Sequence, residues 1–303
     1  MMREVAMKSV MPLAALTLAA AALGPAAAAG AGTATRSLIA FASNRSGDTE
    51  IYVMTPDGTG VHRLTRSPKF DSPQQWSPDG KKLLFYSQRG RGGGVYVMND
   101  DGSGVRNLSP NPAFTAPGSW SPEGTKIVFW SNRDGSNDIY VMSSDGSHVD
   151  RLTDDPASDS NPAWSPNGKS IAFTSDRSGT PQIYVMNVDG SDPRPVTSGR
   201  GAHDFARWLP GGHAIAFGGG TKHRPEIDVV NADGTGLHTV LHDTTYIGGF
   251  YFSPDGRKVV FSSGRDQAAG ELYVMNTDGT GVKRLTNNKF GDNAPVWSPA
   301  LKP

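Results

Sequence analysis

A segment of five residues recurs at a nearly constant interval along most of this 303-residue chain. Its complete form is Trp-Ser-Pro, then Asp, Glu or Asn, then Gly, and the weaker copies change one or more of these positions. The copies begin at Trp76, Trp120, Trp164, Trp208, Phe252 and Trp297, so each step is 44 or 45 residues. Two further motifs keep this spacing: Phe-x-Ser-x-Arg, first found at Phe41, and Tyr-Val-Met-x-x-Asp-Gly, first found at Tyr52. A chain with this period is expected to fold into a series of similar units.

Each unit is expected to contain four short strands. A Pro-containing segment leads into the Trp, and the Ser-Pro-Asp-Gly turn is followed by an alternating strand such as 169–175. A polar loop, a strand such as 183–186, an Asp-Gly turn and a last strand ending in Leu-Thr complete the unit. Gly and Pro recur too often for long helices. Four strands in forty-odd residues are typical of a β-propeller blade.

The two ends of the repeat region are complementary parts of one unit. The region begins at Leu38, inside a second strand, and stops at Pro299, just after a first strand. We therefore expect an all-β, six-bladed β-propeller with four-stranded blades, in which residues 294–297 pair with residues 39–43 and close the ring. Closure would leave no long unpaired sheet edge. An open solenoid is the alternative, and it predicts atypical capping repeats at both ends.

Composition limits both structure and partners. The 37 Gly and 22 Pro residues would suggest disorder in a chain without a period, but here many of them fall in the repeated turns. The 29 basic and 29 acidic side chains balance and no long basic run is present, so nucleic acid is not an expected partner. The absence of cysteine excludes disulfides, thiolate zinc sites and Cys nucleophiles.

The N-terminal residues have the order of a secretory signal peptide. Arg3 and Lys8 precede an apolar run at 12–23, and small residues at 26–29 offer a cleavage site. A retained N-terminal anchor is the alternative. The expected division is a signal peptide at 1–29, a short linker at 30–37 and the propeller at 38–303. No later stretch has the roughly 20 apolar residues of a membrane helix, so we expect a secreted or periplasmic protein with no transmembrane segment after cleavage.

The recurring WSPDG, FxSxR, IYVMxxDG and RLT segments resemble the WD40-like repeat of TolB-type β-propellers over residues 38–299. The resemblance covers the propeller alone, without the separate N-terminal domain of TolB proteins. It implies the propeller fold and suggests a protein, a peptide or another cell-envelope component as the partner.

Most of the repeated residues are expected to be structural. A Trp once per blade is best explained by packing between blades, with carbohydrate stacking as the alternative. The Asp-Gly pairs after Tyr-Val-Met are expected to be hairpin turns, because they lack the late Glu and other ligands of a calcium loop. The arginines that end the second strands are expected to pair with acids that begin the third strands. These arginines are Arg45, Arg89, Arg133, Arg177 and Arg265, and the acids are Glu50, Asp138, Glu226 and Glu271.

The candidate site is the channel rim at which the first strands begin. First strands line the channel of a propeller, so residues at their starts converge on one small ring. Counting back from the Trp or Phe places there Asp71, Ser72, Thr115, Asp159, Ser160, His203, Asp204, Asp292 and Asn293. Four blades thus contribute an acid. Three interpretations remain open: a solvated rim without a role, a surface that binds a basic peptide or protein, and a divalent-cation or catalytic site.

A second candidate is the irregular fifth unit, residues 209–241, in which the repeat motifs fail together. Five of the seven histidines lie in or beside it: His203, His213, His223, His238 and His242. Their spacing matches no metal motif. Sequence drift and relaxed packing for a partner both remain open.

The sequence contains no G-x-S-x-G, H-E-x-x-H, P-loop or dinucleotide-binding motif. We therefore expect an exported, monomeric, non-catalytic propeller without a cofactor, which binds a protein, a peptide or a cell-envelope component at the mouth of its channel. The alternative is a secreted carbohydrate-active lyase or hydrolase that uses the same rim with a bound divalent cation.

Overall fold

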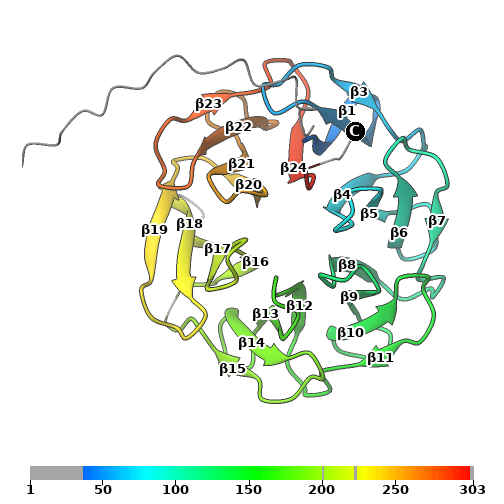
Figure 1. Cartoon of the computed structure of the whole chain (residues 1–303), viewed down its shortest axis with the longest axis vertical. Helices are drawn as coiled ribbons and strands as arrows, with labels where there is room; N and C mark the ends of the chain where they lie inside the picture. Colours follow the sequence, from blue (N-terminus) through cyan, green and yellow to red (C-terminus); the bar gives the residue numbers. More distant parts are fainter. Residues whose placement is uncertain (1–36, 200, 222–223, 301–303) are drawn as a thin grey trace, which may run out of the picture. The chain divides into compact units, whose positions relative to one another are not determined.

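The computed structural model describes residues 37–199, 201–221 and 224–300, and every regular element in these ranges is a β-strand (Figure 1). No helix long and apolar enough to cross a membrane occurs in the described part of the chain. The predicted signal peptide (1–29) and most of the predicted linker (30–37) lie outside the described residues.

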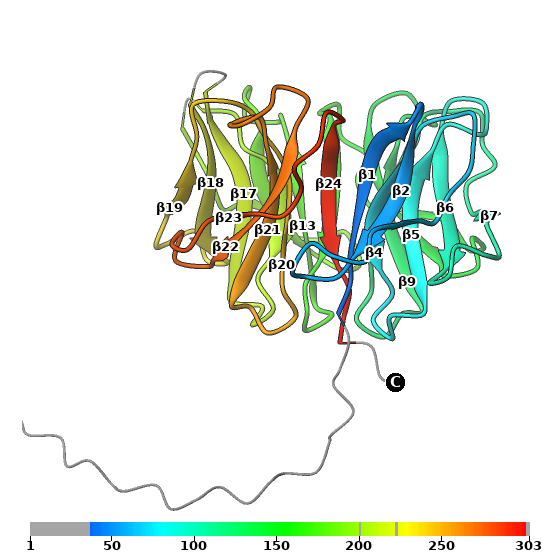
Figure 2. The same cartoon turned by 90° about the horizontal axis from the view of Figure 1, so that it is seen from above.

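The strands form six antiparallel sheets of four strands, here numbered as blades 1 to 6 (Figures 1 and 2). Blade 1 contains β24 (Asp292–Trp297), β1 (Ile39–Ser46), β2 (Asp48–Met54) and β3 (His62–Arg63). Blade 2 contains β4 (Asp71–Trp76), β5 (Lys82–Ser87), β6 (Gly94–Asn99) and β7 (Arg106–Asn107). Blade 3 contains β8 (Thr115–Trp120), β9 (Lys126–Ser131), β10 (Asp138–Ser143) and β11 (Asp150–Arg151).

The remaining blades repeat this arrangement. Blade 4 contains β12 (Asp159–Trp164), β13 (Ser170–Ser175), β14 (Gln182–Asn187) and β15 (Arg194–Pro195). Blade 5 contains β16 (Asp204–Trp208), β17 (Ala214–Thr221), β18 (Arg224–Asn231) and β19 (His238–His242). Blade 6 contains β20 (Ile247–Phe252), β21 (Lys258–Ser263), β22 (Glu271–Asn276) and β23 (Lys283–Arg284). In every blade the first strand of the order given lies nearest the centre of the ring (Figure 1).

The last strand in the sequence, β24, closes the ring. It pairs antiparallel with β1, with Ile39 opposite Trp297 and Ser43 opposite Asp292. The Leu38 amide donates to Ser298 Oγ (2.7 Å), and the Ser298 amide donates to the Leu38 carbonyl (2.8 Å). The predicted six-bladed propeller and its closing strand are therefore confirmed, and the open solenoid is wrong.

The apolar core lies between neighbouring blades. The Phe residues of the Phe-x-Ser-x-Arg motif and its fifth, degraded copy are fully buried: Phe41, Phe85, Phe129, Phe173, Phe217 and Phe261. Trp76 of blade 2 packs in one cluster with Ile51 and Val53 of blade 1. The repeated Trp thus fills the space between blades, as predicted, and truncating so large a buried side chain typically costs about 3–5 kcal/mol.

The Asp-Gly segments after Tyr-Val-Met form the predicted turns between third and fourth strands. In the first of them, Asp57 Oδ1 accepts a hydrogen bond from the Thr59 amide (3.0 Å), and Gly58 has a φ of 91°, which favours glycine. Hydrogen bonds from Thr55 and Thr59 lower the pKa of Asp57 to about 2. This carboxylate therefore stabilises the turn.

Removing residues 292–303 is expected to destabilise the whole ring, because β1 then loses its inner partner. We expect the melting temperature to fall by at least about 10 °C, or the protein to become insoluble. Removing only residues 301–303, which follow β24, is the control. Equal melting temperatures for both truncations and the full chain would show that the closing strand does not hold the ring together.

Candidate binding site in the central channel

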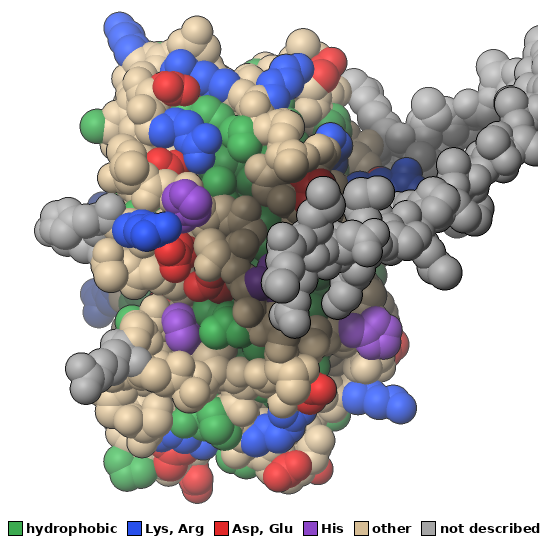
Figure 3. Space-filling model, turned by 90° about the vertical axis from the view of Figure 1, so that its left-hand side faces the viewer, with side chains coloured by type: hydrophobic (Ala, Val, Ile, Leu, Met, Phe, Trp, Pro, Cys, Tyr) green, Lys and Arg blue, Asp and Glu red, His purple; other side chains and the backbone are tan. Residues whose placement is uncertain are grey.

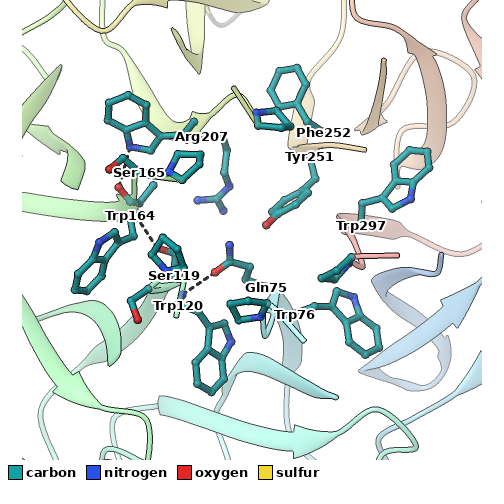
Figure 4. A pocket seen from close by; sticks show the side chains of 18 of the residues that line it. Gln75, Trp76, Ser119, Trp120, Trp164, Ser165, Arg207, Tyr251, Phe252 and Trp297 are labelled. Atoms are coloured by element: carbon teal, nitrogen blue, oxygen red, sulfur yellow. Dashed lines mark hydrogen bonds between the residues drawn. The ribbon is translucent and has the colours of Figure 1, made fainter. Parts of the chain in front are cut away.

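A cavity of about 470 Å³ occupies the central channel where the first strands end (Figure 4). The Trp-Ser-Pro segments and their variants surround this end, which we call the Ser-Pro mouth. Its wall includes the aromatic residues Trp76, Trp120, Trp164, Trp208, Phe252 and Trp297 and the prolines Pro78, Pro122, Pro166, Pro210, Pro254 and Pro299. A mainly apolar, concave wall of this kind is typical of ligand sites.

The residue just before the Trp or Phe differs from blade to blade. In five blades it lines the cavity, as Gln75, Ser119, Ala163, Arg207 and Tyr251. Because the Trp and Pro positions are nearly constant, this variable position decides the polar character of the site.

A β-bulge precedes this position in each first strand. In β16, Asp204 lies opposite Gly218 and Arg207 lies opposite Ala216, so β16 has one residue more than its partner. The inserted segment includes Phe205, whose φ is 58°. Similar register shifts occur in the first strands of the other blades. A bulge re-aims the side chains near it, which helps to direct this position toward the channel.

Two of these side chains bind the next blade. Gln75 Oε1 accepts a hydrogen bond from the Trp120 amide, and Ser119 Oγ accepts one from the Trp164 amide, both at 2.7 Å (Figure 4). A first strand has no neighbouring strand on its channel side, so its backbone donors there need other partners. Gln75 and Ser119 provide the acceptors for one such donor in blade 3 and one in blade 4.

Arg207 and Tyr251 point toward the middle of the channel (Figure 4). Burial lowers the pKa of the Arg207 guanidinium, against smaller opposing effects of Tyr251 and Asp204. Burial also raises the pKa of the Tyr251 hydroxyl, which therefore stays protonated and can donate a hydrogen bond.

The residues predicted as the site lie at the other end of the first strands, about 17 Å away. Three of their carboxylates are fully buried, and each pairs with the arginine that ends the second strand. These pairs are Asp71–Arg89 (2.5 Å), Asp159–Arg177 (2.9 Å) and Asp292–Arg45 (2.8 Å). Burial raises the pKa of Asp71 and Asp159, while hydrogen bonds from serine and the paired arginine oppose this effect. These three carboxylates are therefore held by arginines rather than solvated, and binding by these residues stays a prediction.

In blade 3, Thr115 takes the place of the aspartate. It is buried and shares a hydrogen bond with Ser131 (3.0 Å). Ser72, Ser160 and Asn293 are partly exposed. Their role in binding stays a prediction.

Asp204 is the rim acid without an arginine partner among the described residues. Its Oδ1 accepts hydrogen bonds from Asn161 Nδ2 (2.8 Å) and Thr174 Oγ1 (2.7 Å). The neighbouring His203 is partly exposed, and its Nδ1 lies 2.9 Å from Gln182 Oε1. Burial lowers the pKa of His203 below its ordinary value of about 6.5, although the Asp228 charge acts in the opposite direction.

The predicted ion pairs between second and third strands are wrong. Three of the second-strand arginines reach the first strand instead, Arg265 pairs with Asp243 in the segment after β19, and Glu226 pairs with Arg224 of its own strand. The other three third-strand acids pair with arginines of the fourth strand. The latter pairs are Glu50–Arg63 (2.6 Å), Asp138–Arg151 (2.8 Å) and Glu271–Arg284 (3.0 Å). The guanidinium of Arg45 lies over the rings of Phe41 and Tyr52, at 5.3 and 4.9 Å from their centres. This stacking directs the arginine head toward the first strand.

Blade 5 keeps four strands although its motifs fail, and its β17–β18 hairpin has eight residues in each strand. Asp228, which replaces the motif Tyr, is buried and accepts a hydrogen bond from Thr239 Oγ1 (2.6 Å). Figure 3 shows separate histidine side chains on this side of the ring, and His223 lies outside the described residues. Within residues 37–300, apart from the three left out, no group of three or more His, Asp or Glu side chains is placed to hold a metal ion.

Sequence reasoning missed Arg207, Tyr251 and Gln75. The predicted rim residues lie at the start of each first strand, whereas these three residues lie at its end, just before the Trp or Phe. The signal in the repeats was weak, because the residues before this position vary as much as it does and only the Trp-Ser-Pro residues after it are nearly constant.

Comparisons with known proteins agree with the propeller. A sequence model described as the TolB beta propeller domain matches residues 26–114 and 111–301. TolB from Acinetobacter baumannii superposes with a TM-score of 0.78 at 22% identity, over 88% of this chain and 68% of its own. A putative TolB from Agrobacterium tumefaciens gives a TM-score of 0.67 at 24% identity, over 86% of this chain and 91% of its own. A curated relative, the uncharacterized peptidase YuxL of Bacillus subtilis (strain 168), is 44% identical over 48 residues, which is 16% of this chain and 7% of the relative.

Replacing Arg45 by Met should destabilise the protein more than replacing Arg133 by Met. Both guanidinium groups stack on a Phe and a Tyr, but only Arg45 also pairs with a buried aspartate. Leaving Asp292 buried without its partner should cost about 3 kcal/mol beyond the control, measured by urea unfolding at pH 7. Equal losses in the two variants would mean that the ion pair contributes nothing to stability.

Acidification should destabilise the wild type more than a His203→Asn variant. The pKa of His203 is lowered in the folded state, so the unfolded state binds a proton more readily. The stability contributed by neutral His203 is therefore present at pH 7.5 and is lost as the pH falls through about 6.5 toward the folded-state pKa. Urea unfolding at pH 7.5, 6.5 and 5.5 measures the difference, and parallel pH curves for both proteins would contradict it.

Proposed function

Because the chain belongs to the TolB β-propeller domain family, we propose that it is a non-catalytic binding propeller that receives a segment of a protein or peptide at the Ser-Pro mouth. The observation that carries this proposal is the 470 Å³ cavity with its aromatic and proline wall. Such cavities combine a large apolar contact area with a few polar groups that orient the ligand.

The form of the site favours an extended peptide segment. A concave, mainly apolar channel mouth to which five blades each contribute the residue before the Trp or Phe offers separate contacts along an extended chain. The backbone amides of Trp120 and Trp164 are already bonded to Gln75 and Ser119. Strand addition to the inner edge is therefore disfavoured there, and recognition falls to the side chains.

We also propose that the protein acts outside the cytoplasm as a monomer, on a protein, a peptide or a cell-envelope component. The order of basic, apolar and small residues in 1–29 supports export. The lyase or hydrolase alternative is not favoured, because three of the rim carboxylates that it would use are already paired with arginines.

The test begins with peptides selected from a random display library on the purified protein, with binding measured by tryptophan fluorescence. A Gln74→Trp variant places a bulky side chain in the cavity wall. We expect it to weaken binding of the selected peptides at least about tenfold, because it removes space that the ligand needs.

Gln88→Trp is the matched control, because Gln88 is exposed, belongs to the same blade and does not line the cavity. It should leave the affinity unchanged. Equal affinities in both variants, or no peptide bound more tightly than millimolar, would refute binding at the Ser-Pro mouth.

A further inference from the structure

Arg207 is the one charged residue among the described residues that line the Ser-Pro mouth. It stands just before Trp208 on β16, where blades 2, 3, 4 and 6 carry the uncharged Gln75, Ser119, Ala163 and Tyr251. The irregular blade therefore brings a single positive charge into an otherwise neutral, mainly apolar wall.

Arg207 has no ion-pair partner in the described part of the chain. Its Nη1 donates a long hydrogen bond to the Ala206 carbonyl (3.4 Å). Asp204 is the acid whose charge acts on it, but Asp204 Oδ1 already accepts from Asn161 and Thr174. A partly exposed guanidinium that lines a mainly apolar cavity and lacks an ion-pair partner binds an anion readily, because the anion supplies the charged acceptor that the protein does not.

Two neutral donors surround the same space. The Tyr251 hydroxyl points toward the middle of the channel from blade 6 (Figure 4). Gln75 uses Oε1 to accept from the Trp120 amide, so its Nε2 faces the channel beside the Tyr251 hydroxyl, with which it interacts (Figure 4). Donors from blades 2, 5 and 6 thus converge, and no acidic side chain lines the cavity with them.

The charge balance favours a carboxylate over a phosphate as the bound anion. One guanidinium neutralises one carboxylate and matches its two oxygens with a planar pair of N–H groups. A phosphate near neutral pH carries up to two charges, so one of them would remain uncompensated in this mainly apolar cavity. A carboxylate can belong to an acidic side chain or to a chain terminus, and the recognition chemistry is the same for both.

We propose that Arg207, the Tyr251 hydroxyl and the Gln75 amide form a carboxylate-binding site that anchors an acidic group of the bound segment. This inference rests on the proposed function. The ligand expected here is acidic, whereas the aspartates at the other end of the channel suggested a basic ligand.

The test uses three probes of equal size, titrated into the full protein at low salt and followed by tryptophan fluorescence. They are N-acetyl-Phe-Gln-amide, which is neutral, N-acetyl-Phe-Glu-amide, which has a side-chain carboxylate, and N-acetyl-Phe-Gln, which has a terminal carboxylate. We expect at least one acidic probe to bind about tenfold more tightly than the neutral probe. The probe that does so identifies the source of the carboxylate.

Two variants should abolish this preference. Arg207→Met removes the charge, and Gln75→Glu places a carboxylate beside Arg207 while keeping an acceptor for the Trp120 amide. Arg257→Met is the control, because Arg257 is exposed and does not line the cavity. Melting temperatures report whether each variant is folded.

Equal binding of neutral and acidic probes to the wild type would overturn the carboxylate site, as would a preference that survives in Arg207→Met. Absence of binding by all three probes at 10 mM would overturn it too. If neutral and acidic probes bind the wild type equally while Gln74→Trp still weakens the selected peptides, the carboxylate anchor fails but binding at the Ser-Pro mouth stands. If Gln74→Trp leaves the selected peptides bound, the proposed function itself fails.

Discussion

Packing between blades is the interaction on which the rest of the structure depends. A four-stranded blade has two apolar faces and cannot bury both of them alone. Each blade therefore needs two neighbours, and the cluster that joins Ile51 and Val53 of blade 1 to Trp76 of blade 2 shows how the motif residues meet this need. A ring gives every blade two neighbours only if its ends join, which is the role of the pairing between β24 and β1.

Ring closure also explains how residues from separate blades, at one repeated position of the motif, come together in a single site. The residue before each Trp or Phe is repeated about every 44 residues, and in five blades the ring brings it to the wall of the same cavity. The aromatic and proline positions are nearly constant, so substitutions at this position change the cavity wall and, where the side chain bonds the next blade as Gln75 and Ser119 do, the contact between blades. Arg207 therefore changes the charge of the cavity wall, while the aromatic and proline residues around it stay nearly the same as in the other blades.

Charge is distributed unevenly along the channel for a related reason. At the start of the first strands, buried aspartates meet the arginines that end the second strands, as in Asp71–Arg89 and Asp292–Arg45. Burying such charges requires pairing, so these residues contribute to the architecture. Arg207, at the other end, has no such partner among the described residues and is left available to a ligand.

The sequence by itself determined the number of blades, their four strands, the turns and the closing strand, because repeated spacing and turn residues act locally and recur six times. Only the tertiary structure decided which charges are free. Arg45 and Asp292 are 247 positions apart, and no local pattern indicates that they meet. The position of the cavity was likewise decided by the ring, because it depends on bulges in the first strands and on side chains that converge from separate blades. Spacing along a chain predicts repeated local structure, whereas ion pairing and cavity shape depend on distances that exist only after the ring has closed.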